Sequence, residues 1–330
     1  MEYMPELRLI RPASVAEAVS ARRDAPEARL LAGGTDIVPN IRRGIVAPGT
    51  LIDVSEIAEM GRIEADGDGL RIGAAVTLTA LGEHPEVRAR YPVLVEAATK
   101  VAARTHRNVA TVGGNLCLDT RCVFYNQSEW WRRSNDYCFK HQGDVCHVAP
   151  KTVACFAAYS GDVAPALIVL DAEVEIASAD GVRVIPLPDL YREDGRDHVR
   201  LDPDELVVAV RVPNRDGWRS GYAKARVRSA IDFPLAGVAA AVRLDDDVVA
   251  GVRVALTGTN PRPLLVEGTE AVVGQRLEDA AIARLVDLIP KQIQPMTSTF
   301  TPPGYRRRVV ANMTRSLLRR LSARVRIEDG

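Results

Sequence analysis

The segment Thr111–Cys117 reads TVGGNLC and opens the stretch, ending at Cys155, from which the fold and cofactors of the chain are predicted. Its two glycines, Gly113 and Gly114, allow a tight turn and a close approach of the backbone to another group, such as a phosphate. The stretch also contains every cysteine of the 330-residue chain, namely Cys117, Cys122, Cys138, Cys146 and Cys155. Because thiolates are soft metal ligands, the stretch predicts a phosphate-binding turn beside a metal centre.

The cysteines are clustered, since all five lie within 39 positions. Thiols stay reduced in a cytoplasmic protein, and an odd number does not form a closed disulfide set, so we expect metal ligands. No Cys-x-x-Cys pair occurs, and 15, 7 and 8 residues separate the last four cysteines in turn. This spacing disfavours a zinc ribbon and lacks the compact ferredoxin pattern. On spacing alone, an iron–sulfur cluster, zinc and free buried thiols all stay open, with His141 and His147 as neighbours and Cys117 as the spare thiol.

The composition argues against a nucleic-acid-binding or membrane protein. Lysine plus arginine balances aspartate plus glutamate at 43 each, and hydrophobic residues make up 47% of the chain. These values are ordinary for a soluble globular protein. The N-terminus has no apolar signal-peptide core, and no apolar run approaches the length of a membrane span. We therefore expect a cytoplasmic protein of two or three domains.

An earlier glycine pair lies in the segment Leu30–Ile37, which reads LLAGGTDI. We expect a strand directly before the pair and a turn at it, with backbone N–H groups that suit a pyrophosphate. A Gly-Gly-Thr-Asp sequence between apolar residues is by itself most often an ordinary turn. Upstream, Ser14 and Glu17 form a capping box that predicts a helix to about Arg23.

The rest of the chain predicts two parts, with a linker at Asn214–Gly217 that places a domain boundary near residue 216. Before the linker, strands are expected at residues 50–54, 70–77, 166–176, 182–187 and 205–213, and a helix at 91–103. After it, strands are expected at residues 238–242 and 248–256, and helices at 269–273, 277–289 and 305–325. The last helix carries an apolar stripe, which indicates core packing or, alternatively, a subunit contact.

Four motifs occur together: the two glycine-pair segments, Gly221–Arg226 (GYAKAR) and Asp232–Ala236 (DFPLA). Their combination resembles the FAD-binding subunit or domain of the xanthine dehydrogenase family of molybdenum hydroxylases, over nearly the whole chain. The resemblance implies an α+β fold. Residues 1–216 would form a two-part FAD-binding domain of the PCMH, or vanillyl-alcohol-oxidase-like, type, divided near residue 55. Residues 217–330 would form a smaller α+β domain of the CO dehydrogenase flavoprotein type.

The resemblance also implies which residues bind FAD, with both glycine loops holding its diphosphate. One wall of the site would comprise Leu30, Leu31, Ala32, Gly33, Gly34, Thr35, Asp36 and Ile37. The other wall would comprise Val101, Ala102, Ala110, Thr111, Gly114 and Asn115. Asp162 would face the ribose of the adenosine half, although the proline expected beside Ser160 is absent. Lys224 would approach the cofactor from the C-terminal domain.

The chain departs from most of the family in an insertion at about residues 117–158, which carries the cysteines. This insertion resembles the one in the beta subunits of 4-hydroxybenzoyl-CoA reductases. The resemblance implies a [4Fe–4S] cluster whose ligands are Cys122, Cys138, Cys146 and Cys155. It also implies three partners, in an (αβγ)2 heterohexamer of anaerobic aromatic degradation: a molybdopterin-binding large subunit, a [2Fe–2S] small subunit and ferredoxin as the electron donor.

The function so implied is electron transfer. Electrons would pass from ferredoxin through the [4Fe–4S] cluster and FAD to the [2Fe–2S] and molybdenum centres, where a partner removes a phenolic hydroxyl reductively. No residue of this chain is assigned to substrate chemistry. Two alternatives remain at this point: the FAD subunit of a related xanthine or CO dehydrogenase-like hydroxylase with NAD as partner, and a flavin module with a structural zinc loop. The chain has no second nucleotide fingerprint of the G-x-G-x-x-G type, which disfavours NAD.

Overall fold

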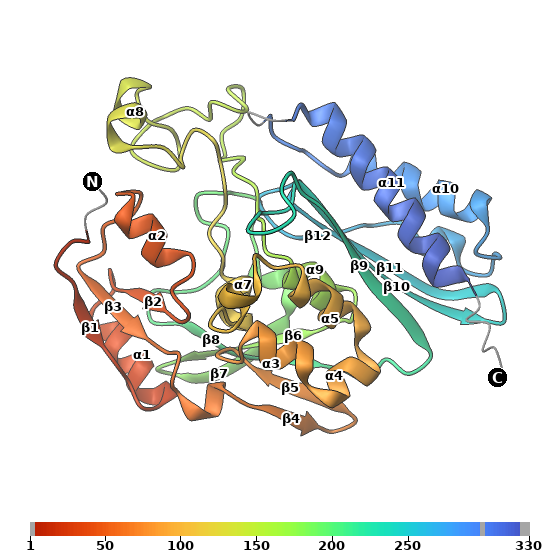
Figure 1. Cartoon of the computed structure of the whole chain (residues 1–330), viewed down its shortest axis with the longest axis horizontal. Coiled ribbons are helices and arrows are strands. Elements are labelled where there is room, and N and C mark those ends of the chain that lie inside the picture. The colour runs from red at the N-terminus through yellow and green to blue at the C-terminus, as the bar shows by residue number, and fades with distance from the viewer. Residues whose placement is uncertain (1–3, 298–300, 324–330) are drawn as a thin grey trace.

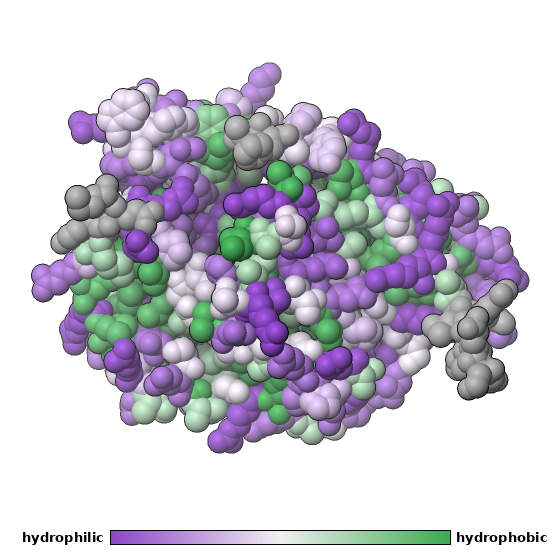
Figure 2. All heavy atoms as spheres, viewed as in Figure 1, coloured by the Kyte–Doolittle hydropathy of each residue, from purple (hydrophilic) through white to green (hydrophobic). Residues whose placement is uncertain are grey.

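The computed structural model describes residues 4–297 and 301–323, and Figure 1 shows their arrangement in three β-sheets with associated helices. In the described part of the chain, no helix is both long and apolar enough to cross a membrane. On the face shown in Figure 2, hydrophobic residues are scattered among hydrophilic ones. The separate sheets and mixed helices agree with the predicted α+β class.

The N-terminal sheet has three parallel strands in the order β1 (Arg8–Ile10), β3 (Thr50–Asp53) and β2 (Arg29–Leu31). Helices α1 (Val15–Asp24) and α2 (Ile37–Arg42) connect the strands. The first glycine pair therefore lies between the carboxyl end of β2 and the start of α2, a position where parallel sheets commonly bind ligands.

The predicted Ser14 cap of α1 is confirmed, while the Glu17 side chain bonds back to Ala13, one residue before the N-cap. The backbone N–H of Glu17 donates to Oγ of Ser14 at 3.2 Å, and the N–H of Ala13 donates to a carboxylate oxygen of Glu17 at 2.8 Å. These bonds satisfy N–H groups that have no partner inside the helix.

The middle sheet has five antiparallel strands in the order β4-β5-β8-β6-β7. The strands are β4 (Ile63–Asp66), β5 (Gly69–Gly73), β6 (Glu173–Ser178), β7 (Gly181–Pro186) and β8 (Leu206–Val212). Between β5 and β6 the chain forms α3 (Leu78–Glu83), α4 (Pro85–Arg90), α5 (Pro92–Thr99), α6 (Arg104–Arg107), α7 (Val112–Leu116), α8 (Glu129–Ser134) and α9 (Val163–Ile168). The second glycine pair lies within α7, next to this sheet.

The C-terminal sheet has four antiparallel strands in the order β12-β11-β10-β9. The strands are β9 (Trp218–Ala225), β10 (Ala236–Asp245), β11 (Val248–Thr257) and β12 (Leu264–Leu265), followed by α10 (Asp279–Leu288) and α11 (Pro303–Ser322). Helix α11 packs on strands β9 and β10 and α10 packs on α11, while α5 and α9 from the preceding part contact strands β9, β10 and β11 (Figure 1). The proposed boundary at residue 216 lies between β8 and β9.

The cysteine-rich insertion leaves the body and returns to it at one point. Arg121 and Ala158 exchange two backbone hydrogen bonds, of 2.8 and 2.9 Å. Between them the chain runs out to α8, which lies beyond α2 in Figure 1. Arg132 of α8 donates to the carbonyl oxygens of Gly44 and Ile45, which directly follow α2. The insertion therefore rests on the same segment that follows the first glycine loop.

The strand predicted at residues 166–176 is wrong in its first half, because residues 163–168 form α9 and the strand begins at Glu173. All six residues of α9 are buried, so the apolar run has no polar face to reveal its helical period. The helix predicted at 91–103 ends at Thr99, and the segment predicted as a helix at 269–273 is a 3-10 turn at Thr269–Val272. The last helix ends at Ser322, and the predicted residues 324–325 lie outside the described chain.

Candidate cofactor sites

The first glycine loop presents backbone donors that nothing in the protein uses. Among the described residues, the N–H groups of Gly33, Gly34, Thr35 and Asp36 have no hydrogen-bond partner, and all four residues are half-buried. Gly34 has φ +70°, a left-handed conformation that favours glycine. Consecutive unpaired N–H groups at a strand–helix turn form an anion-binding concavity. The loop therefore fits the diphosphate of a dinucleotide.

The second glycine loop differs because its N–H groups are already bonded. The N–H groups of Val112 and Gly113 donate to the carbonyls of Val76 and Ala74, at 2.9 and 2.8 Å. The N–H of Gly114 donates to Oγ1 of Thr111 at 3.1 Å, a helix N-cap bond. The resemblance implied that both loops hold the diphosphate, but free N–H groups occur in the first loop only.

The two loops nevertheless touch each other. A Cβ added at Gly33 would overlap the carbonyl oxygen of Val109, and the N–H of Ala110 would lie 2.8 Å from it. Gly33 thus allows the first loop to lie directly on the segment before Thr111. The structure brings together the two walls that the sequence predicted for the flavin site.

A buried polar cluster joins the C-terminal sheet to these walls. Lys224 donates to Asp162 at 2.8 Å and to the carbonyl oxygen of Lys100 at 3.0 Å. Tyr222 donates its hydroxyl to the other oxygen of Asp162 at 2.6 Å. Burial raises the pKa of Asp162, while Lys224 and Tyr222 act in the opposite direction. Asp162 and Lys224, both predicted to contact FAD, therefore bind each other, and Tyr222 is a member of the cluster that sequence analysis missed.

Ala102 of the second wall has a strained backbone conformation and is hydrogen-bonded to a second residue of the same kind, Ile231. Ala102, a predicted flavin contact, has φ 41°, and its carbonyl oxygen accepts a hydrogen bond from the N–H of Ile231 at 3.1 Å. Ile231 has φ 49° as well. Two neighbouring non-glycine residues in the left-handed region indicate a segment held in place by its surroundings, as occurs at ligand sites.

Arg121 connects the first glycine loop to the cysteine insertion, and sequence analysis missed it. Its guanidinium forms an ion pair with Asp36 and lies 4.7 Å from the centre of the Phe233 ring. Burial lowers the pKa of Arg121 to about 10. Because Cys122 follows directly, this ion pair fixes the start of the cysteine loop against the candidate flavin site.

The four cysteines predicted as ligands are all buried. Cys122, Cys138, Cys146 and Cys155 are 5–9% exposed. Burial raises the pKa of Cys122, and the nearby Cys138 and Cys146 raise it further. Burial raises the pKa of Cys155 to about 12, with smaller contributions from Cys146 and Cys122. Cys122 therefore lies near Cys138 and Cys146, and Cys155 lies near Cys146 and Cys122.

Cys117 lies apart from this group. Burial raises its pKa to about 12, and its charged neighbour is Arg22 of α1 rather than another cysteine. Its position at the end of α7 confirms that it follows the second glycine loop directly. The assignment of Cys117 as the spare thiol stays a prediction, and its position beside Arg22 agrees with it.

The backbone around Cys138 is tightly wound. Tyr137, directly before it, has φ 58°, and Gln142 has φ 59°. A Cβ on Gly143 would lie 2.5 Å from the backbone nitrogen of Cys138.

The His147 ring stacks on Phe124 at 4.9 Å, and His141 packs edge-on against Tyr137 at 5.3 Å. Both histidines are therefore engaged as aromatic neighbours of the cysteines.

Four buried thiols match the donor set of a [4Fe–4S] cluster in number and chemistry. Within residues 4–297 and 301–323, however, no three histidine, cysteine, aspartate or glutamate side chains already have the geometry of a metal-ion site. The thiols must be deprotonated before they bind a metal, and the metal's own charge favours that step.

The fold and the unpaired first glycine loop fit a nucleotide-binding protein, and comparisons with known proteins identify its class. Residues 5–215 match the family "FAD binding domain in molybdopterin dehydrogenase", and residues 221–321 match "CO dehydrogenase flavoprotein C-terminal domain". The chain belongs to the FAD-binding subunits of the molybdenum hydroxylase family. The predicted fold class and the predicted FAD are thereby confirmed, and the protein is an oxidoreductase subunit.

Individual relatives cover most of the chain. The aldehyde oxidoreductase FAD-binding subunit PaoB of Escherichia coli is 37% identical over 273 residues, which are 79% of this chain and 83% of the relative. The carbon monoxide dehydrogenase medium chain of Hydrogenophaga pseudoflava is 27% identical and covers 97% of this chain and 98% of its own. The solved CO dehydrogenase of Oligotropha carboxidovorans has a TM-score of 0.81 at 23% identity, covering 98% and 99% of the two chains.

Proposed function

We propose that this chain is the FAD and iron–sulfur subunit of a molybdenum hydroxylase that oxidises its substrate on a partner subunit. The first glycine loop binds the FAD diphosphate, and the residues predicted above for the second wall, other than Gly114 of the already bonded second loop, line the cofactor. The four grouped cysteines of the insertion bind a [4Fe–4S] cluster. Bound FAD can exchange electrons singly or in pairs, so it can connect a one-electron carrier to a two-electron reaction.

One observation carries the iron–sulfur part of the proposal. Cys122, Cys138, Cys146 and Cys155 are all buried, Cys138 and Cys146 raise the pKa of Cys122, and Cys146 and Cys122 raise that of Cys155, whereas the charged neighbour of Cys117 is Arg22. A structural zinc loop remains the alternative occupant, since zinc also accepts four thiolates.

The partners follow from the relatives, which are named as FAD-binding subunits and medium chains. We propose a molybdopterin-binding large subunit and a small [2Fe–2S] subunit, assembled with this chain as an (αβγ)2 heterohexamer. The domain division at residue 216 is part of the same proposal.

The direction of electron flow separates two candidate functions. The aldehyde oxidoreductase subunit PaoB and a further relative, the putative xanthine dehydrogenase FAD-binding subunit XdhB of Escherichia coli, which is 28% identical over 312 residues, favour oxidation of an aldehyde, xanthine or a similar substrate, with electrons leaving through this chain. The cysteine insertion favours 4-hydroxybenzoyl-CoA reduction, with electrons arriving from ferredoxin. We adopt the first and retain the second because of this insertion.

The experiment begins with the full chain purified without oxygen. We expect about four irons and four sulfides per FAD, the stoichiometry of one [4Fe–4S] cluster. Cys122→Ser should lose the iron and keep FAD, whereas Cys117→Ser, the matched control, should keep both. One bound zinc without iron, or equal iron loss in both variants, would contradict the cluster assignment.

A second measurement tests the direction. The assembled complex is mixed separately with an aldehyde, with xanthine and with 4-hydroxybenzoyl-CoA plus reduced ferredoxin. Bleaching of the flavin absorbance by an aldehyde or xanthine supports the oxidative function. Consumption of 4-hydroxybenzoyl-CoA with reduced ferredoxin, and no bleaching by the others, establishes the reductive one instead.

A further inference from the structure

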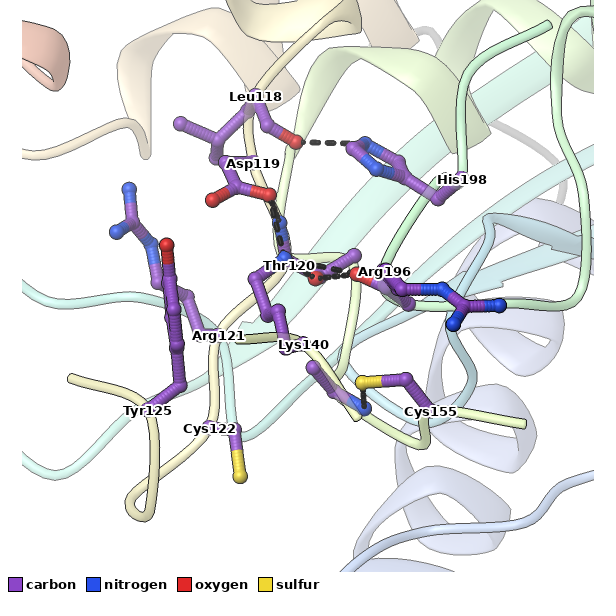
Figure 3. A network of polar contacts seen from close by, with 12 residues as sticks. Leu118, Asp119, Thr120, Arg121, Cys122, Tyr125, Lys140, Cys155, Arg196 and His198 are labelled. Atoms are coloured by element: carbon purple, nitrogen blue, oxygen red, sulfur yellow. Dashed lines mark hydrogen bonds and ion pairs between the residues drawn. The ribbon is translucent and has the colours of Figure 1, made fainter. Parts of the chain in front are cut away.

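Arg121 places a positive charge at the first glycine loop. Its guanidinium forms an ion pair with Asp36, the last of the four loop residues whose N–H groups have no partner in the described chain. The Arg121 side chain is only 14% exposed. Figure 3 shows that it extends to the side opposite the sulfur atom of Cys122, the next residue. Its charge therefore acts at the glycine loop rather than at the cysteines.

The Arg121 guanidinium has a donor that the described residues leave unused. Its Nε is buried and has no hydrogen-bond partner among them. The guanidinium lies over the Phe233 ring, 4.7 Å from the ring centre, so one of its faces is covered. An arginine carries five N–H donors, and a buried donor without an acceptor is costly. Such a donor indicates an acceptor supplied by a ligand, for example an oxygen of a bound anion.

The carboxylate of Asp36 explains why this loop needs a cation. One of its oxygens contacts the Arg121 guanidinium, and the other accepts a hydrogen bond from Nδ2 of Asn40 at 3.1 Å. A diphosphate bound by the N–H groups of the loop would bring further negative charge near this carboxylate, and like charges repel. Burial lowers the pKa of Arg121 to about 10, so the guanidinium stays protonated at neutral pH. Arg121 therefore offsets the carboxylate and attracts an anion.

We propose that Arg121 is a binding residue for the FAD diphosphate and donates to a phosphate oxygen from the part of its guanidinium that Asp36 leaves free. Hydrogen bonds from arginine to phosphate are charge-assisted and about twice as strong as neutral ones. The segment that opens the cysteine insertion then also completes the flavin site. The inference rests on the proposed function, since it takes the first glycine loop as the diphosphate site.

A purely structural role is the competing explanation. The ion pair between Arg121 and Asp36 joins the start of the insertion to the glycine loop. If this joint only holds the loop in shape, removal of either partner should weaken FAD binding. A direct contact with the diphosphate instead predicts opposite effects for the two members of the pair. Loss of the guanidinium removes an attraction, whereas loss of the carboxylate removes a repulsion.

The test titrates FAD into the full chain after its own FAD has been removed, and it follows flavin fluorescence. In Arg121→Gln, we expect the Kd for FAD to rise about 10- to 100-fold, the loss typical of a hydrogen bond to a charged group. Arg121→Lys keeps the charge without the forked donors, so its Kd should rise less. Asp36→Asn should lower the Kd. Arg133→Gln is the control, because Arg133 is an exposed arginine of the same insertion.

The outcomes separate the two levels of the proposal. Absence of FAD binding in the wild-type chain refutes the proposed function itself. Weaker binding in Arg121→Gln, with a Kd at or below wild type in Asp36→Asn, supports the inference. Weaker binding in both variants, or wild-type affinity in Arg121→Gln, overturns it. If Arg121→Gln does not fold, the Asp36→Asn titration decides, because weaker FAD binding there overturns the role of Arg121 and tighter binding supports it.

Discussion

The two glycine loops have the same Gly-Gly pair and use it for different contacts. In the first loop, residues 33–36 leave four backbone N–H groups without a partner in the described chain. In the second, the N–H groups of residues 112–115 bond to Val76, Ala74 and Thr111. A glycine pair therefore marks a close approach of the backbone, and only the hydrogen bonds tell whether the neighbour is protein or ligand.

Among substitutions in the two glycine loops, Gly33→Ala is expected to reduce the FAD content most. The added Cβ would overlap the backbone carbonyl of Val109, so the first loop must move off the second. We expect the purified variant to retain almost no FAD, measured as flavin released per chain. Gly49→Ala is the control, because a Cβ there meets nothing within 4 Å. Full FAD content in Gly33→Ala would show that the loops need not touch.

Gly113→Ala should lower the stability of the fold rather than the affinity for FAD. Its Cβ would lie 2.7 Å from that of Ala74, in a fully packed region. Overpacking of this kind typically lowers the free energy of unfolding by about 1–3 kcal/mol. Denaturant unfolding of the FAD-free chain measures that loss. Weaker FAD binding without any loss of stability would place the second loop at the cofactor instead.

A smaller effect, specific to FAD, is expected for Gly34→Ala. A side chain at its φ of +70° costs about 1–2 kcal/mol, which corresponds to roughly 5- to 30-fold weaker binding if the strain falls on the loop. Flavin fluorescence titration measures the affinity. Gly44→Ala is matched in φ, at +65°, but lies outside the loop, so it should leave FAD affinity unchanged. Equal losses in the two variants would refute a special role for Gly34.

The smallest effect is expected for Gly114→Ala. Its Cβ would lie 3.1 Å from Oγ1 of Thr111, within helix α7, where alanine gains up to about 1 kcal/mol of helix propensity over glycine. The two contributions nearly cancel, so the thermal midpoint and the FAD affinity should both stay close to wild type. A loss of FAD here would mean that the cofactor approaches the second loop through Gly114 itself.

Much of the local structure was predictable from sequence because it depends on near neighbours. The Ser14–Glu17 capping box and the turn after β2 follow from residues a few positions apart. The C-terminal hairpin of β10 and β11 follows from alternating apolar residues around the Asp246-Asp247 turn. Helix α9 was missed because its residues are all buried, which removes the periodic signal.

The polar contacts of the candidate sites could not be predicted in the same way. Arg121, at the start of the insertion, forms an ion pair with Asp36 of the first glycine loop. Lys140, inside the insertion, donates a hydrogen bond to the carbonyl oxygen of Gly195. Single arginine and lysine residues form no pattern, and their partners are many tens of positions away in the chain. Buried charges need partners, but the sequence does not say which ones.

By itself, the sequence determined the α+β class, the two glycine pairs and the supply of five thiols. Only the tertiary structure decided which pair keeps its N–H groups free and which thiols have another cysteine, or Arg22, as a neighbour. The reason is that residue type fixes what a group can bond to, whereas its actual partner depends on chain segments that meet only in the folded protein.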